Sequence, residues 1–299
     1  MTVWSTLFIR RYRLRHAVDM DLSKCFDRLD HNLIIASLRR RVSDGSVLDL
    51  IRMFLESGVM INGHLEDTKI GSPQGGVISP LISNVYLDAF DQEMKRRGHR
   101  IVRYADDILI LCRSRSAAER AREVATTILE CDLRLTVNQE KTHLIHAQQG
   151  VKFLGVTISL NWTQIQAKKI AAFKAKVKAI TCRNSPVNLE QVLADLNPVL
   201  RGFANYFRMA NAKSIFMDLA IWIRRRLRAK QLALWKTPDR LHRRLRQLGY
   251  QGEFAHIRMR SWHNSKSPLA SYAMPNAWLS SLGLFDLAAV ETGVLPPTC

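Results

Sequence analysis

Two adjacent carboxylates, Asp106 and Asp107, are the residues best placed in the sequence to do chemistry. They lie between the apolar runs 101–104 and 108–112, which have the pattern of a β-hairpin, so the bend would hold both side chains rigidly. Neighbouring carboxylates repel each other, and a compensating cation is expected close to them. Taken alone the pair is ambiguous, because acidic residues are also common in ordinary turns.

A third carboxylate, Asp21, ends the upstream segment 16–21, which is predicted to be a strand. If that strand lies beside the hairpin, three carboxylates meet at one edge of a sheet. Oxygen donors of this kind suit Mg²⁺, which keeps several waters and takes its other ligands from substrate phosphates. Two such ions roughly 4 Å apart activate a 3′-hydroxyl and stabilise a pyrophosphate leaving group. Asp19, on the same strand face, is the competing candidate.

The elements around these carboxylates predict a mixed α+β unit. Asp30 is expected to cap a helix to about residue 42, and Ser79 is expected to cap another, with Pro80 as its first helical residue. Further helices are predicted near 46–56 and 117–131, and further strands near 135–137, 143–146 and 151–158.

The pattern changes near residue 160, where we place a boundary. Residues from about 168 to 248 are predicted to be helical, with breaks at 184–186 and 237–239. The last fifty residues contain four prolines and are expected to be irregular.

The charge of the chain favours a polyanionic partner. There are 45 Lys and Arg against 26 Asp and Glu, and residues 201–260 alone hold 15 basic and 3 acidic side chains. Within that stretch Arg224, Arg225, Arg226 and Arg228 form a cluster whose planar guanidinium groups suit phosphate. A solvated charged face, or attraction to an acidic membrane surface, is the alternative interpretation.

Cysteine spacing and hydropathy indicate the compartment. The five cysteines include no C-x-x-C pair, which fits a reducing cytosol better than a disulfide framework or a zinc ribbon. No apolar stretch reaches the ~18–20 residues that cross a bilayer, and the N-terminus lacks the order of a signal peptide. A cytoplasmic protein without a membrane partner is expected.

Several motifs occur in one order along the chain and together resemble a known family. They cover residues 16–158, continue at 200–208, and end in short motifs at 262–276. In sequence they read DLSKCFD (21–27), GSPQGGVISPLISNVYLDAFD (71–91), RYADD (103–107), NQEKT (138–142), FLG (153–155) and LRGFANYFR (200–208). The chain resembles the bacterial group II intron reverse transcriptases, RNA-directed DNA polymerases that also act as maturases.

The resemblance implies a role for each matching residue of the reaction centre. Asp21, Asp106 and Asp107, with the Leu22 carbonyl, would hold two Mg²⁺ ions, for which Mn²⁺ can substitute. Phe26 would stack under the incoming sugar and exclude a 2′-hydroxyl. The remaining implied roles are nucleotide contact for Gln74, Gly75 and Lys141, the last beside the leaving pyrophosphate, and grip of the primer end for Phe153, Leu154 and Gly155.

The resemblance also implies the architecture and the partners. The fold class is α+β, a reverse transcriptase palm with an antiparallel sheet backed by helices, followed by an α-helical thumb called maturase domain X. The expected ranges are a palm at 1–160, a thumb at 161–248 and an irregular C-terminal segment at 249–299. The partners are an RNA template or group II intron RNA, a DNA primer and dNTPs. The thumb residues expected to bind RNA are Arg201, Tyr206, Arg208, Arg224, Arg225, Arg226 and Arg228.

The start of the chain departs from the family pattern. Only 20 residues precede Asp21, too few for the fingers region that holds the triphosphate, so an N-terminally truncated member is expected. Three functions remain open at this point. They are polymerisation, with the fingers supplied by a partner chain or a homodimer, a non-polymerising RNA-binding splicing cofactor, and an inactive remnant.

Overall fold

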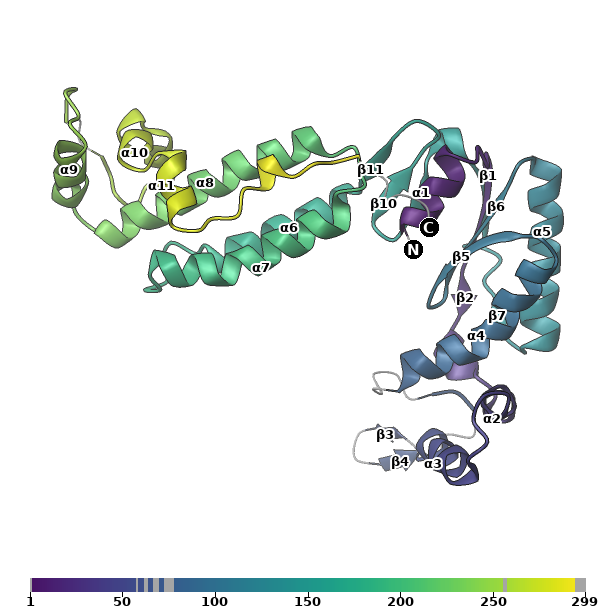
Figure 1. Ribbon diagram of the computed structural model, residues 1–299. Helices are drawn as coiled ribbons and strands as arrows, with labels where there is room; N and C mark the ends of the chain where they lie inside the picture. Colours follow the sequence, from purple (N-terminus) through teal and green to yellow (C-terminus); the bar gives the residue numbers. More distant parts are fainter. Residues whose placement is uncertain are drawn as a thin grey trace. The chain divides into compact units, whose positions relative to one another are not determined.

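The computed structural model describes residues 2–57, 59–61, 64–66, 70–72, 78–254 and 257–293. The chain divides into two compact units, Met1–Trp162 and Thr163–Cys299, called here the N-terminal unit and the C-terminal unit. Figure 1 shows the elements of each unit.

The N-terminal unit mixes helices with short strands. Its helices are α1 (Thr2–Arg10), α2 (His31–Arg39), α3 (Gly45–Glu56), α4 (Ser79–Arg96) and α5 (Arg115–Thr127), with 3-10 turns η1 (Cys25–Arg28) and η3 (Ala147–Gln149) and a π-helical turn η2 (Ile128–Asp132). Its strands are β1 (His16–Met20), β2 (Leu22–Ser23), β3 (Val59–Ile61), β4 (His64–Glu66), β5 (Arg100–Tyr104), β6 (Asp107–Cys112), β7 (Thr136–Val137), β8 (His143–His146), β9 (Val151–Phe153) and β10 (Val156–Ile158).

The central sheet of this unit is antiparallel, with the strand order β5-β6-β1-β8. Strand β1 pairs with β6 from His16 opposite Cys112 to Met20 opposite Ile108. The first strand of the chain therefore lies directly beside the hairpin formed by β5 and β6, as the sequence predicts. Smaller antiparallel pairs join β2 to β7, β3 to β4 and β9 to β10.

Helices α4 and α5 back the sheet through one apolar core, and Figure 1 shows α5 running along it. Val18 and Met20 of β1 join this core, since alternate residues of a strand point to the same face. The helices contribute large side chains such as Tyr86 and Phe90 and a small-residue stripe that includes Ala121. The expected α+β palm architecture, an antiparallel sheet backed by helices, is confirmed.

The start of α4 differs by one residue from the prediction. Ile78 is its N-cap and Ser79 is already helical, with Pro80 in the first turn. The Ser79 hydroxyl accepts a hydrogen bond from the Ser72 hydroxyl at 2.8 Å and is buried. The Ser79 side chain, which the sequence predicts to be the helix cap, is therefore bonded to a residue seven positions earlier in the chain.

The C-terminal unit is helical, as expected. Helices α6, α7 and α8 run side by side in Figure 1, joined by buried side chains that include the stacked rings of Phe173 and Phe203. The elements are β11 (Thr163–Ile165), α6 (Ala167–Ile180), α7 (Leu189–Phe207), α8 (Lys213–Trp235), α9 (Pro238–Gln247), η4 (His263–Lys266), α10 (Pro268–Ala273), α11 (Asn276–Ser281) and η5 (Leu287–Ala289). In the described part of the chain no helix combines the length and apolar content that crossing a membrane requires.

The segment after Leu248, expected to be irregular, contains two short helices. Pro268 occupies the first turn of α10 and Pro275 the N-cap of α11, positions where a missing backbone N–H is tolerated. Leu269 and Leu279 are buried, and Leu269 joins a core with Leu232 of α8. The prolines therefore begin helices here instead of preventing them.

Candidate functional site

The β5–β6 hairpin holds two of the three predicted carboxylates. Tyr104 pairs with Asp107, which leaves Ala105 and Asp106 as a two-residue turn. Ala105 has a φ of 53°, in the left-handed region that non-glycine residues rarely adopt. A non-glycine residue keeps this backbone conformation only where its surroundings enforce it, so the turn is tightly held.

Arg103 is the residue that holds the turn in place, a role that no pattern in the sequence predicts. Its Nη1 donates to the Ala105 carbonyl and to Asn84 Oδ1 of α4, both at 3.0 Å. Its Nη2 and Nε donate to the Asp91 carboxylate at 2.7 and 2.9 Å, and both side chains of this ion pair are largely buried. One guanidinium thus ties the carboxylate-bearing turn to helix α4.

Asp21 lies at the same sheet edge. Met20 of β1 is opposite Ile108, so the next residue on each strand is Asp21 on one side and Asp107 on the other. The Asp21 carbonyl accepts from the Asn138 backbone N–H at 2.9 Å, and Leu22 then pairs with Val137. This continuous pairing fixes the chain on both sides of Asp21.

The electrostatics of this edge also indicate that the carboxylates are neighbours. Burial, followed by the charges of Asp106 and Asp21, raises the pKa of Asp107. Burial and then Asp107 raise the pKa of Asp19 to about 6, with a smaller upward effect of Asp21 and an opposing one from His143. Asp19 therefore belongs to the same charged cluster, as its place two residues before Asp21 on the strand requires.

The donor set of this edge fits a divalent cation. Among the described residues, no three His, Cys, Asp or Glu side chains form a ready-made metal cluster. Mg²⁺, however, commonly takes one or two carboxylates and completes its shell with water and substrate phosphate. Burial is the main cause of the raised pKa of Asp107, and the charges of Asp106 and Asp21 add to it. A bound cation would offset the negative charge of these neighbours.

Lys141 lies beside the carboxylates. Its Nζ is 3.5 Å from Asp21 Oδ2, in an ion pair whose lysine side chain is 69% exposed. Asn138 positions it, because the Asn138 side chain accepts from the backbone N–H groups of Glu140 and Lys141 at 3.2 and 3.3 Å. An exposed pair of this kind adds little stability, so the amine remains available to a ligand.

Phe26 lies in η1 and is tied to the glycine-rich loop. Its carbonyl accepts from the Ser72 N–H at 2.8 Å, and the Gly71 N–H donates to Leu29. A Cβ on Gly71 would come within 2.8 Å of Asp27 backbone atoms, so only glycine permits this approach. Gln74 and Gly75, the predicted nucleotide contacts, lie outside the described residues.

The predicted primer-gripping residues form a tight hairpin. Phe153 of β9 pairs with Val156 of β10, which leaves Leu154 and Gly155 as the turn. Their φ values are 46° and 86°, as a two-residue hairpin turn with two left-handed positions requires. Phe153 is buried, and the turn holds the other two residues in place.

The residues predicted to bind RNA divide into two groups in the C-terminal unit. Arg201, Tyr206 and Arg208 have exposed side chains on or directly after α7, and the Arg201 guanidinium lies over the Phe285 ring at 5.1 Å from its centroid. Four arginines of α8 instead contact protein partners. Arg224 pairs with Asp286, Arg225 bonds the Ser265 hydroxyl, Arg226 bonds the Thr181 hydroxyl, and Arg228 bonds the Met274 carbonyl and Asn276.

The hairpin carries two carboxylates, and the strand beside it, β1, is followed directly by a third, Asp21. On an antiparallel sheet backed by helices, this arrangement defines a polymerase-type palm. Residues 6–158 match the sequence profile of the family "Reverse transcriptase (RNA-dependent DNA polymerase)", and residues 170–249 match "Group II intron, maturase-specific domain". The chain belongs to the reverse transcriptase family, in its group II intron maturase branch.

Individual relatives agree with this assignment. Protein YkfC of Escherichia coli is 32% identical over 177 residues, covering 48% of this chain and 46% of the relative. The group II intron-encoded protein LtrA of Lactococcus lactis is 26% identical over 208 residues, covering 48% of this chain and 35% of the relative. The chain thus spans less than half the length of these relatives.

Among solved structures, telomerase from Candida tropicalis in complex with a TWJ fragment of telomeric RNA is similar with a TM-score of 0.49 and 14% identity. The match covers 95% of this chain and 49% of the telomerase chain. A likeness of this strength carries no inference about function.

Proposed function

We propose that this protein catalyses RNA-directed DNA synthesis by nucleotidyl transfer at the sheet edge that carries Asp21, Asp106 and Asp107. The main support for this proposal is the register of β1 with β6, which puts Asp21 next to Asp107. Asp107 directly follows Asp106, which lies in the turn between β5 and β6. The substrates are an RNA template, a DNA primer and dNTPs. The palm is assigned to residues 1–160, the thumb to 161–248 and a C-terminal segment to 249–299.

The three carboxylates and the Leu22 carbonyl would hold two Mg²⁺ ions, or Mn²⁺ in their place. When bound, the ions supply charge stabilisation for the attacking 3′-oxygen and for the leaving pyrophosphate. Arg103 holds the turn in place through its bonds to Ala105 and Asp91. Reacting groups that are already oriented lose less entropy on reaching the transition state.

Three further groups complete the proposed centre. Lys141, close to Asp21, neutralises the charge that develops on the leaving pyrophosphate. Phe26 presents its ring to the incoming sugar and rejects a 2′-hydroxyl. The turn of Leu154 and Gly155, with Phe153, supports the primer end. Gln74 and Gly75 complete the nucleotide contacts.

Primer extension on an RNA template with Mg²⁺ and dNTPs tests this proposal. The Asp106→Ala variant is expected to lose product, whereas Asp49→Ala, which removes an exposed carboxylate on α3, is expected to retain it. Undiminished product from Asp106→Ala, or no product from the unmodified chain, would contradict the assignment.

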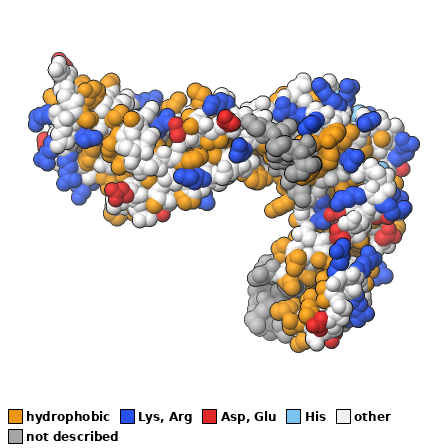
Figure 2. Space-filling view, viewed as in Figure 1, with side chains coloured by type: hydrophobic (Ala, Val, Ile, Leu, Met, Phe, Trp, Pro, Cys, Tyr) orange, Lys and Arg blue, Asp and Glu red, His pale blue; other side chains and the backbone are white. Residues whose placement is uncertain are grey.

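A second function, binding of intron RNA to assist splicing, is favoured by a separate set of observations. The maturase-specific profile covers residues 170–249. Residues 201–260 carry 15 basic and 3 acidic side chains, and Figure 2 shows a group of Lys and Arg at the end of the C-terminal unit where α9 lies. The exposed Arg201, Tyr206 and Arg208 are the contacts that the structure favours most, since Arg224, Arg225 and Arg228 of α8 already have protein partners.

Salt dependence of RNA affinity tests the binding role. Log affinity is expected to fall linearly with log salt, and removing one phosphate-binding guanidinium, by Arg201→Gln or Arg208→Gln, should lower the slope by about 0.7. Arg39→Gln, on α2 of the other unit, is the matched control. Binding that persists in Asp106→Ala separates this role from polymerisation, and a slope unchanged in both thumb variants would refute the placement of the RNA on α7.

A further inference from the structure

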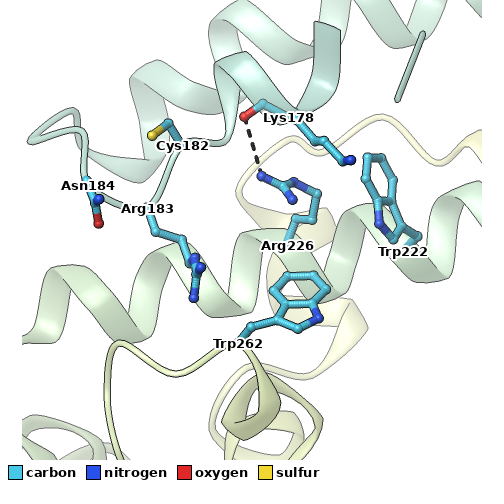
Figure 3. Close-up of a pocket in the computed structure, with 7 residues that line it drawn as sticks. All are labelled: Lys178, Cys182, Arg183, Asn184, Trp222, Arg226 and Trp262. Carbon is cyan, nitrogen blue, oxygen red and sulfur yellow. Dashed lines mark hydrogen bonds between the residues drawn. The ribbon is translucent and has the colours of Figure 1, made fainter. Parts of the chain in front are cut away.

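The C-terminal unit contains a cavity of about 470 Å³ that the functions above do not use. Its wall combines the end of α6, the loop that follows it, one face of α8 and a tryptophan from the later segment, as Figure 3 shows. We call it the tryptophan–arginine pocket. It is lined by Lys178, Cys182, Arg183, Asn184, Trp222, Arg226 and Trp262.

The charged side chains of this lining are all basic. They are Lys178, Arg183 and Arg226, and no carboxylate joins them in the part of the chain that the structure describes. Among the described residues none of the three forms an ion pair. Burial, and then the charge of Arg183, lowers the pKa of Arg226. Like charges held together without a counter-ion favour an anionic ligand.

The pocket also contains two indole rings, those of Trp222 and Trp262. The Arg226 guanidinium lies over the rings of Trp222 and Trp262, at 5.3 and 5.7 Å from their centroids. Arg225 covers Trp262 at 4.3 Å, and Lys174 lies over Trp222 at 5.8 Å. In Figure 3 the two indoles flank Arg226. Indole rings and guanidinium planes are the groups on which proteins stack unpaired RNA bases.

The walls are fixed by hydrogen bonds. Arg226 Nε donates to the Thr181 hydroxyl at 2.6 Å, and Arg183 Nη1 donates to the Arg260 carbonyl at 2.9 Å. The ammonium of Lys230, a residue with 0% exposure, donates to the carbonyls of Cys182 and Ser185 and so secures the loop. A site that is already formed loses less entropy when a ligand enters it.

Two hydrogen-bond donors of the pocket remain available to a ligand. Among the described residues neither Lys178 Nζ nor Arg226 Nη1 has a hydrogen-bond partner, and Lys178 is exposed at the rim. The pocket volume lies within the range of about 300–1,000 Å³ that small-molecule sites occupy. The pocket is open to solvent on one side. A base can reach its rings and guanidinium planes only when it is unpaired, whereas a base held inside a duplex cannot.

We propose that the tryptophan–arginine pocket binds one unpaired nucleotide of an RNA strand, with the phosphate on Lys178 and Arg183 and the base against the indoles and Arg226. The proposal rests on the RNA-binding function above and adds a single-strand-specific site to it. A free nucleotide shares the same chemistry and is the alternative source of the ligand. Its affinity is tested separately.

The test uses the full chain and a short single-stranded RNA that carries one fluorescent 2-aminopurine. Loss of one stacked base weakens binding roughly 5- to 150-fold. We expect a loss in this range for Trp262→Leu, partial recovery for Trp262→Phe, and a loss for both Arg183→Gln and Lys178→Gln. Lys168→Gln, an exposed lysine of the same helix α6, is the control for Lys178→Gln. A fully paired RNA duplex should bind all of these variants equally.

The results of this experiment distinguish a failure of the pocket proposal from a failure of the RNA-binding function. RNA that binds the unmodified chain and the pocket variants with the same affinity overturns the pocket while leaving the RNA-binding function intact. A chain that binds neither single-stranded nor duplex RNA overturns both. Adenosine monophosphate that binds alone, as tightly as the strand, and fails to bind Trp262→Leu would assign the pocket to free nucleotides. A phosphoserine peptide that competes equally would refute recognition of a base.

Discussion

Replacing Arg103 by methionine is expected to loosen the hairpin that carries Asp106 and Asp107. The side chains of Arg103 and Asp91 are 8% and 17% exposed, so the change leaves a nearly buried carboxylate without its partner. Breaking a buried pair in this way costs about 3–5 kcal/mol. Because Asp91 keeps some contact with water, we expect the lower end, about 3 kcal/mol.

Hydrogen exchange of the β5 and β6 amides measures this cost locally, without requiring the two units to unfold together. A loss of ~3 kcal/mol corresponds to exchange about 100-fold faster. The control is Arg96→Met, which removes an arginine that pairs with Glu93 on the same helix but is 71% exposed. That change should leave the exchange rates unaltered.

A double-mutant cycle with Asp91→Leu separates the ion pair from the bonds to the turn. Removing both partners abolishes the unpaired charge, so the double variant should be less destabilised than the sum of the two single variants. Primer extension should stay impaired in the double variant, because the bond from Arg103 to the Ala105 carbonyl is still missing. Exchange rates that change less than about fivefold in Arg103→Met would refute the reasoning.

Three further predictions concern single residues. Gly71→Ala should lower the free energy of unfolding by at least about 1–2 kcal/mol, measured by denaturation, because its φ is 93° and the new Cβ would meet the Asp27 backbone. The pKa of Asp19 is raised to about 6 in the folded state, so the folded chain holds this proton more tightly than the unfolded chain does. Stability should therefore fall as pH rises through 6. In melting experiments at different pH values, Asp19→Asn should abolish this dependence. Lys141→Gln should slow nucleotide incorporation about 100-fold without changing RNA affinity, and an unchanged single-turnover rate would refute its role.

The palm could be predicted because its signals are local. The apolar runs around Asp106 and Asp107 fix the hairpin, and Asp30 caps α2 by accepting from the Asn32 and Leu33 amides, as expected from its residue type. Helix α3, by contrast, begins at Gly45, one residue before the predicted start, and Asp44 is its N-cap. A helix that begins with Gly45 carries a weak start signal in the sequence.

The remaining parts of the site depend on contacts between distant residues. Arg103 acts through Asp91 and Asn84, and nothing in its neighbouring residues distinguishes it from a solvated arginine. Arg224 and Arg228 belong to a charge run that predicts phosphate binding, yet their partners lie 46 to 62 residues further along the chain. Trp262 is another such case, because only the fold brings it beside Arg226.

The bonds between α8 and the chain beyond residue 260 have a consequence for shortened forms of the protein. Arg224, Arg225 and Arg228 are held by Asp286, Ser265, and Met274 with Asn276 respectively. Proteolytic removal of that tail would release three guanidinium groups into solvent and uncover the apolar surface beneath them. A clipped chain should therefore adhere to polyanions of every kind more strongly, while losing discrimination and colloidal stability.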